Sequence, residues 1–363
     1  MTAKGWDRLT ITVDNYPEVP GTDNAGGKYQ LAGAIAPEIV SVSRATDIPA
    51  LYAEWFMARL RIGYVIWENP FSHKRQCISF AKTRVIVFWS KNPRELMRYL
   101  PEIDAREINY YFQFTLNDYE REMLEPGLPQ LDMRIATFIE LAARVGPDRV
   151  VWRFDPLVLS DTITVDMLIA RIEAIGNRIH GSTRRLVFSF VDIGTYKKVR
   201  ENMKKKGFPD IREFTPDEKI RFAEKLQALN QTWGLELFTC GEEIDLVRYG
   251  IYQGRCIDYA LMERIFLNDR KLMNFLRPCT QIQLLTPEHG MSAGYKKDPG
   301  QRQECGCHAA KDIGHYNTCI HNCVYCYANS SGKNPVNRYE QYRRHADVGH
   351  FFENIIPDGG RPA

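Results

Sequence analysis

The stretch Val85-Ile-Val-Phe-Trp-Ser-Lys-Asn-Pro93 combines a strand with the start of a helix. Val85 to Trp89 are all β-branched or aromatic, which is typical of a strand covered on both faces. Polar residues follow at once, and Pro93 opens a segment with helical periodicity that extends to Leu100. This stretch therefore predicts a strand, a polar turn and a helix, the repeating unit of a parallel sheet.

Five further segments of the same character occur along the chain and bring the predicted strands to six. They are residues 39–43, 110–115, 150–154, 186–190 and 235–239. Helical periodicity covers residues 50–60, 133–145, 165–179, 195–204 and 216–233. This alternation predicts right-handed βαβ units, and six units predict a partial (β/α)6 barrel. A doubly wound open sheet is the alternative, although no glycine-rich nucleotide motif follows the first strand.

One helix start is marked clearly, by Thr215-Pro216-Asp217-Glu218. The threonine is a helix cap, the proline suits the first turn, and the two acids interact favourably with the helix dipole. We therefore expect a helix that begins at Pro216.

The composition is that of an ordinary globular protein. The chain has 363 residues, 44% of them hydrophobic and 26% charged, with a net charge of +3. That charge is too small to indicate a dedicated nucleic-acid binder. The N-terminus has neither a signal peptide nor a membrane anchor, so we expect a cytoplasmic protein. We expect three segments: an N-terminal extension (1–37), the barrel (38–268), and a cysteine-rich cap that closes the barrel mouth (269–363).

Polar residues follow the end of every predicted strand. Because the carboxyl ends of parallel strands meet at one edge, these residues together predict a polar pocket. Taken singly, some have a structural alternative, as a helix cap or as an ion pair between Arg153 and Asp155. The residues are Ser43, Arg44, Thr46, Asp47, Trp89, Ser90, Lys91, Asn92, Gln113, Thr115, Arg153, Asp155, Ser189, Asp192 and Cys240.

The sequence Cys319-Ile-His-Asn-Cys323-Val-Tyr-Cys326 spaces three cysteines by three residues and then by two. Three thiolates can hold three irons of a 4Fe-4S cluster and leave the fourth iron open to another ligand. Zinc is the alternative, but a zinc ribbon usually has two CxxC pairs and this segment has one. The triad therefore predicts a cluster with an open iron.

The chain has nine cysteines, and those outside the triad predict a second metal site. In a reducing compartment such cysteines are more often ligands or free thiols than disulfides. Cys240, Cys256, Cys305 and Cys307 supply four ligands, for an auxiliary iron-sulfur cluster or for zinc. Cys279 is expected to pack as a small apolar side chain. We expect the neighbouring His308, His315 and His321 to hydrogen-bond near a cluster sulfur, with a ligand role as the alternative.

The triad, with Tyr325 before its last cysteine, resembles the signature of the radical S-adenosylmethionine (SAM) superfamily. The run from Cys305 to Asn329, with Ser43-Arg-Ala-Thr-Asp-Ile-Pro49 and Phe88-Trp-Ser-Lys-Asn-Pro93, resembles the family DUF1848, over residues 38–330. That family is regarded as radical-SAM-like. Trp152-Arg-Phe-Asp-Pro156 is more weakly similar to spore photoproduct lyase. The resemblance implies a partial barrel and the reductive cleavage of SAM.

The resemblance also implies that SAM lies among the strand ends and that an electron donor such as flavodoxin or ferredoxin reduces the cluster. The chemistry of SAM then suggests which residues bind it. The predicted contacts are Arg44, Lys91 and Arg153 for the carboxylate, Asp155, Asn92 and Gln113 for the ribose diol, Tyr325 or Trp89 for the adenine, and Ser43.

The chain departs from the superfamily pattern in one respect. The triad usually follows the first strand, whereas here it follows the last predicted strand. The protein could therefore cleave a carbon–sulfur bond of SAM other than the one that the superfamily usually cleaves, and this alternative stays part of the prediction. Two other functions are alternatives: a zinc-stabilised binding protein, and a DNA repair enzyme like the photoproduct lyase that uses the basic runs 197–206 and 338–344. The substrate cannot be predicted.

Overall fold

The main sheet has eight strands, and every neighbouring pair in it is parallel. A computed structural model describes residues 5–14, 29–194, 197–276, 297–302, 304–329 and 333–356. The strands lie in the order β11 (Ile251–Gln253), β10 (Glu236–Thr239), β9 (Arg185–Phe190), β8 (Val150–Leu157), β7 (Asn109–Thr115), β6 (Val85–Ser90), β3 (Ile39–Val42) and β12 (Lys311–Asp312).

All six predicted strands are confirmed, but the main sheet has eight strands and not six. The short strands β11 and β12 extend the sheet at its two edges. Within the described residues these edges do not pair with each other, so the sheet is not a closed barrel. Lys311 and Asp312 form a strand too short to produce a hydrophobic pattern, and for this reason it was not predictable.

The helices follow the predicted alternation. Two predicted helices are each split, the first at Tyr52, which is not helical, and the second before Pro101, which sits in the first turn of a new helix. The helices are α1 (Ile48–Leu51), α2 (Ala53–Ile62), α3 (Arg94–Met97), α4 (Leu100–Ala105), α5 (Leu131–Val145), α6 (Val165–Ile179), α7 (Lys197–Lys205), α8 (Pro216–Trp233), α9 (Tyr259–Ile265), α10 (Arg270–Leu276) and α11 (Lys333–Ala346).

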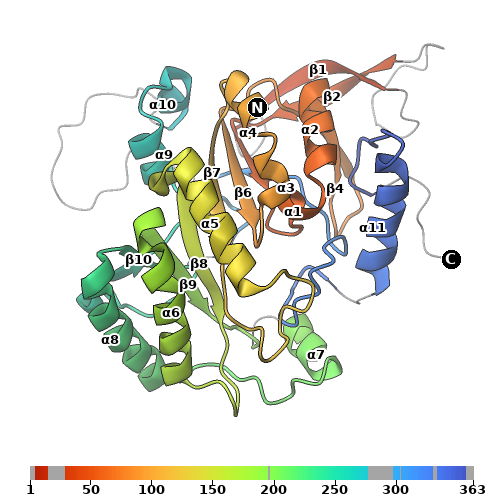
Figure 1. Ribbon diagram of the computed structural model, residues 1–363. Coiled ribbons are helices and arrows are strands. Elements are labelled where there is room, and N and C mark those ends of the chain that lie inside the picture. The colour runs from red at the N-terminus through yellow and green to blue at the C-terminus, as the bar shows by residue number, and fades with distance from the viewer. Residues whose placement is uncertain are drawn as a thin grey trace.

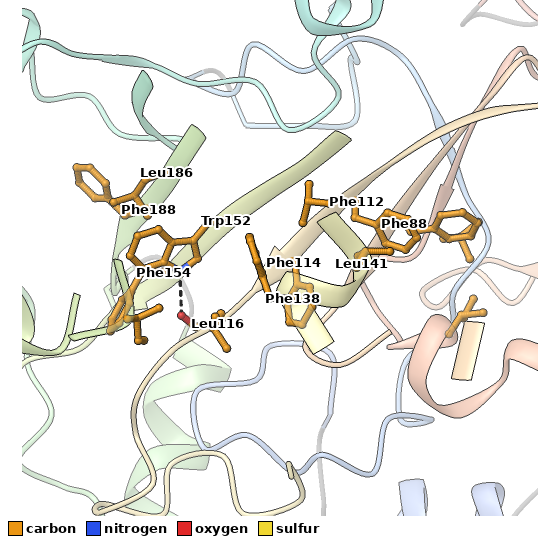
Figure 2. Close-up of a cluster of buried hydrophobic side chains, with 14 of the residues drawn as sticks. Phe88, Phe112, Phe114, Leu116, Phe138, Leu141, Trp152, Phe154, Leu186 and Phe188 are labelled. Carbon is orange, nitrogen blue, oxygen red and sulfur yellow. Dashed lines mark hydrogen bonds between the residues drawn. The ribbon is translucent and has the colours of Figure 1, made fainter. Parts of the chain in front are cut away.

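Alternate residues of the strands face two separate cores. On the face covered by α5 and α6, Phe88 stacks on Phe112 with ring centroids 5.1 Å apart. Figure 2 shows this aromatic core, where the buried Trp152 donates its indole N–H to the carbonyl of Leu116 at 3.1 Å. On the opposite face, residues such as Val87 pack against α9, α10 and the segment around Cys307. The second face therefore brings cysteine-bearing segments to the sheet.

A smaller sheet of four strands lies beside the main one and was not predicted. Its order is β1 (Asp7–Asp14), β2 (Tyr29–Ala36), β5 (Arg75–Ser79) and β4 (Tyr64–Glu68). Alanine and glycine are frequent in β2, and their low strand propensity hides it from a pattern search. The sheet joins residues of the predicted extension to residues 64–79, and the division of the chain at residues 37 and 268 stays a prediction.

The position of β12 determines where the cysteine triad lies. β12 runs parallel to β3, with Lys311 opposite Val40 and Asp312 opposite Ser41. The Asp312 carboxylate accepts hydrogen bonds of 2.8 Å from the Ser41 hydroxyl and from the backbone N–H of Arg44. The segment after β12 therefore begins at the carboxyl edge of the sheet. In the described part of the chain, no helix is long and apolar enough to span a bilayer.

Candidate functional site

Residues 313–329, which we call the triad loop, connect β12 to α11 and carry all three triad cysteines. The loop passes between the main sheet and α11 (Figure 1). It is bonded to the segment that follows β3. The Thr46 hydroxyl lies 2.6 Å from the Thr318 hydroxyl, and His321 Nε2 lies 2.9 Å from the Asp47 carboxylate. These contacts hold the triad loop against the carboxyl edge of the sheet.

Asp47 joins three segments through one buried carboxylate. Besides His321, it accepts hydrogen bonds from the Ser90 hydroxyl at 2.7 Å and the backbone N–H of Lys91 at 2.8 Å. Burial acts to raise the pKa of Asp47, but the hydrogen bond with His321 and the others hold it below its ordinary value. Asp47 was predicted as a strand-end polar residue. Its position fixes the ends of β3 and β6 relative to the triad loop.

Side chains from two other segments fix the backbone of the triad loop. Asn329 donates to the carbonyl of Cys319 at 2.7 Å, Lys206 to that of Cys323 at 3.2 Å, and Asn202 to that of Cys326 at 3.3 Å. These three hydrogen bonds hold the backbone of the loop at each triad cysteine. Lys206 is the last residue of the basic run 197–206, and its ammonium group also donates to Asn322 at 2.8 Å.

The three triad thiols lie close enough for their charges to interact, and all three are at least half-buried. Burial raises the pKa of Cys319 to about 12, whereas backbone N–H groups of Asp47 and His321 donate to its sulfur and favour the thiolate. Cys319 also lines a cavity of about 200 Å³ with Pro126, Asn322 and Val336. One ligand position of the triad is therefore adjacent to open space.

A buried polar network lies between the triad loop and the sheet. Lys91 donates to Glu125 at 2.7 Å and to the Tyr325 hydroxyl at 3.1 Å, and Tyr325 itself donates to Glu125. The Asn117 amide donates to Glu125 and to Tyr325, both at 3.1 Å, and accepts from the backbone N–H of Asp155 at 2.8 Å. We call Lys91, Asn117, Glu125, Asp155 and Tyr325 the polar network.

Two members of this network, Asn117 and Glu125, were not predicted from the sequence. Asn117 lies two residues beyond the end of β7, so a wider search after each strand end would have found it. Glu125 lies ten residues further along than Thr115, in a loop without regular structure, and no local signal marks it. Its role depends on tertiary contacts alone.

Four other cysteines, which we call the four-thiol group, come together from three segments. The sulfurs of Cys240 and Cys256 lie 3.2 Å apart, and the backbone N–H of Cys256 donates to the Cys307 sulfur at 3.1 Å. The Cys307 thiol also contacts those of Cys256 and Cys305. Within the described residues, however, no group of three or more His, Cys, Asp or Glu side chains has the arrangement that holds a metal ion.

Several residues predicted to bind SAM surround the four-thiol group instead of the triad. Arg153 donates to the Cys256 sulfur at 3.1 Å and to Gln113 at 3.2 Å. Arg44 and Arg153 lie on the Trp89 ring, 5.3 and 5.2 Å from its centroid. The charges of Cys307 and Asp312 raise the pKa of Arg44, although burial opposes them. Of the predicted set, Lys91 and Tyr325 are the ones bonded to each other beside the triad.

The remaining predicted residues occupy other places. Ser43 accepts local hydrogen bonds from Ala45 at 3.0 Å and Thr46 at 3.3 Å. Asp155 pairs with Arg153 at 2.6 Å, so the suggested ion pair is present, and it also accepts a hydrogen bond from Ser189. Asp192 pairs with Arg302 at 3.0 Å. Cys279 lies outside the described residues.

The triad loop suits a cluster that takes three thiolates. A cubane spreads its cysteines further than a single ion does, because each thiolate binds a different iron. Buried polar atoms near the loop also have no partner among the described residues, namely Nδ1 of His321 and Oδ1 of Asn92. Such orphaned atoms are costly unless a ligand satisfies them. The three thiols and these atoms are therefore the groups in this part of the molecule that could hold a cluster and its ligand.

These features define a mixed α/β protein with a parallel main sheet, one group of cysteines at its carboxyl edge and a second group against one of its faces. The model of the family described as "Domain of unknown function (DUF1848)" matches residues 39–328, so the chain belongs to this family. This confirms the family that the sequence resembles. No curated protein and no solved structure matches the chain.

Proposed function

We propose that this chain is a radical SAM-type enzyme, in which Cys319, Cys323 and Cys326 hold a 4Fe-4S cluster and the open iron binds SAM. The observation that carries the proposal is the exit of the triad loop at the carboxyl edge of the main sheet. In α/β proteins built on parallel strands, this edge is where reacting groups gather.

The departure from the superfamily pattern has a topological explanation under this proposal. The triad of the superfamily follows the first strand, whereas β12 comes last in sequence among the main-sheet strands. However, β12 lies next to β3, the first of these strands, and runs parallel to it. The order of the strands along the chain is then a circular permutation of the superfamily order. A triad that arrives last in sequence still occupies the edge beside the first strand.

The side chains around the triad have distinct proposed roles. Lys91 is a cation beside the triad loop and is suited to the SAM carboxylate, while Oδ1 of Asn92 is a buried acceptor for an amine or a hydroxyl. When bound, the reduced cluster supplies the electron that cleaves a carbon–sulfur bond of SAM. Asp47, Thr318 and His321 are buried, so they keep water away from one side of the triad.

The proposal is tested by anaerobic reconstitution of the wild type and of a C319A/C323A/C326A variant, followed by iron and sulfide analysis. We expect the variant to lose about four irons and four sulfides per chain. We also expect it to lose all SAM cleavage under dithionite, measured by chromatography of the products. Cys77→Ala is the control, because Cys77 is buried in the smaller sheet away from both cysteine groups.

Two results would contradict the proposal. A wild-type protein fully loaded with iron and sulfide that yields no cleavage product is not a radical SAM enzyme. Zinc in the anaerobically purified protein, without iron or sulfide, would favour the zinc-stabilised binding protein.

A further inference from the structure

The four-thiol group lies against the second face of the main sheet. Cys240 follows β10, Cys256 follows β11, and Cys305 and Cys307 precede β12. Cys256 and Cys307 are almost completely buried, at 4% and 2% exposure, among apolar residues such as Ile257 and Val87. Thiols can pack as small apolar side chains, so burial alone does not indicate a ligand.

Two buried cations distinguish this place from apolar packing. The Arg153 guanidinium is paired with Asp155 and also donates to the Cys256 sulfur. The Arg44 side chain has a buried Nη2 that no described residue bonds, and it lies close enough to Cys307 and Cys256 for their charges to act on it. A buried guanidinium is costly unless an anion accompanies it. Asp155 is that anion for Arg153, whereas Nη2 of Arg44 has no bonded partner among the described residues, and thiolates of the group would supply one.

We propose that Cys240, Cys256, Cys305 and Cys307 bind a second metal centre as thiolates, and that Arg44 and Arg153 balance its negative charge. Four thiolates on a divalent ion carry a net charge of −2, which the two guanidiniums reduce, Arg153 less than Arg44 because Asp155 already pairs with Arg153. Both guanidiniums lie against the Trp89 ring, 5.3 Å and 5.2 Å from its centroid, which holds the two cations close to the same group of thiols. Arg44 and Arg153 thus serve this centre, and the inference is independent of SAM cleavage at the triad.

The thiols must separate slightly to accept a metal. In a tetrahedral site with metal–sulfur bonds of about 2.3 Å, neighbouring sulfurs lie about 3.8 Å apart. The Cys240 and Cys256 sulfurs are 3.2 Å apart, so a small rotation of each side chain is enough for one ion. An iron-sulfur cluster needs a larger separation, since each thiolate binds a different iron. Both forms share the four-thiolate ligand set, and sulfide analysis distinguishes them.

The first experiment measures metal and acid-labile sulfide in full-length protein, purified anaerobically, as wild type, C256A/C307A and C319A/C323A/C326A. We expect C256A/C307A to lose one centre and to keep the triad metal, and the triad variant to show the reverse. Loss of one metal without sulfide identifies a single ion, and loss of iron with sulfide identifies a cluster. Equal metal content in wild type and C256A/C307A overturns the proposal, whatever the outcome for SAM cleavage.

A second measurement covers the case in which C256A/C307A does not fold. Wild-type protein is alkylated with iodoacetamide before and after metal removal by a chelator, and each cysteine is followed by mass spectrometry. We expect Cys240 and Cys305, the two partly exposed members of the group, to be protected in the metal-loaded protein and to react after chelation, with the buried Cys77 unchanged as control. The proposal is wrong if chelation leaves the labelling of these two unchanged, or if the four cysteines are joined as disulfides.

The role of Arg44 is tested by retention of the metal. Removal of a group that supports metal ligands from outside the coordination sphere typically weakens affinity by about tenfold or more. We expect Arg44→Gln to lose the second centre to a competing chelator about tenfold faster than wild type. Arg178→Gln is the control, because Arg178 pairs with Asp132 on the helical surface. Equal rates for Arg44→Gln and wild type would rule out Arg44 as a counter-charge.

Discussion

At the scale of single residues, Gly127 sets how closely the loop after β7 approaches the triad loop. A Cβ atom at this position would lie 2.6 Å from the carbonyl oxygen of Ile320 and 2.7 Å from Cα of His321. Both are backbone atoms, so neither can rotate away. The backbone N–H of Gly127 also donates to the carbonyl of His321 at 3.0 Å. The absence of a side chain is therefore required at this contact.

We predict that Gly127→Ala displaces the triad loop and destabilises the protein by about 1–3 kcal/mol, the usual cost of overpacking. It should also lower the iron bound by the triad. Chemical denaturation and iron analysis measure the two effects. Gly181→Ala is the matched control, because a Cβ atom there meets nothing within 4 Å. Unchanged stability and iron content in Gly127→Ala would show that the two loops can separate freely.

The residues that could be predicted from the sequence are those marked by the spacing of the cysteines or by a position directly after a strand. The triad and Asp47 were found in this way, and Asp47 indeed bonds to the loop that carries the triad. The sequence did not indicate Glu125, whose partners Lys91 and Tyr325 lie 34 and 200 positions away in the sequence. The sequence also did not distinguish the residues near the triad from those near the four-thiol group. The order of the strands along the chain does not determine which of the two groups a side chain contacts.

At the scale of elements, α8 begins with the predicted cap. The Thr215 hydroxyl accepts from the backbone N–H of Glu218 at 3.3 Å, and the Glu218 carboxylate accepts from the backbone N–H of Thr215 at 2.9 Å. This reciprocal pair satisfies two backbone donors that the first turn leaves free. The sequence signal was sufficient here because every group in the cap lies within four residues.

We predict that Thr215→Ala destabilises the protein by about 1 kcal/mol, the usual effect of losing such a cap. Equilibrium denaturation with urea at neutral pH measures this change. Thr232→Ala, at an exposed position in the same helix, is the control and should have little effect. An equal loss in the two variants would assign the effect to the threonine side chain in general and not to the cap.

The same cap gives a pH dependence of stability. The hydrogen bond with Arg212 lowers the pKa of Glu218 to about 2, from an ordinary value of 4.5. Because the folded pKa is lower than the unfolded one, the contribution of Glu218 is complete above pH 4.5 and is lost as the pH falls towards 2. The stability difference between wild type and Glu218→Gln should therefore shrink below about pH 4.5, as followed by denaturation over a pH series. A constant difference would contradict this account.

At the scale of the whole molecule, the segment after residue 296 is part of the main fold. It supplies the edge strand β12, and its backbone accepts hydrogen bonds from side chains of the preceding part. Tyr52 donates to the carbonyl of Thr318 at 2.7 Å, Trp55 to that of Phe352 at 2.8 Å, and Trp67 to that of Gly314 at 3.0 Å. Removing this segment leaves three donors without their partners.

We predict that a chain ending at Leu276 does not unfold cooperatively and associates through the uncovered edge of β3. Deleting the segment exposes the buried side chains of Tyr52 and Trp55 to water, at a cost of roughly 1.5–3 kcal/mol each, which is a large part of the stability of a typical domain. Thermal unfolding followed by circular dichroism and size-exclusion chromatography tests this, with the full chain as reference. A monomeric, cooperatively folded product would instead support a separate cysteine-rich cap.

The arrangement of the elements in the whole molecule was the hardest feature to predict from the sequence. The six longer strands were predictable because each is rich in β-branched and aromatic residues, as in Val85 to Trp89. The order of strands in the sheet was not, since β12 joins β3 across about 270 residues without a pattern of its own. The resemblance to the radical SAM superfamily did not predict the pairing of β12 with β3, because the triad of that superfamily follows its first strand.

The pairing of β12 with β3 also orders events during synthesis. A nascent chain exposes the edge of β3 while the following strands emerge from the ribosome, and exposed edges favour association with other chains. The triad loop emerges after the seven other strands of the sheet, so its three thiols reach their places beside β3 only when the sheet is complete.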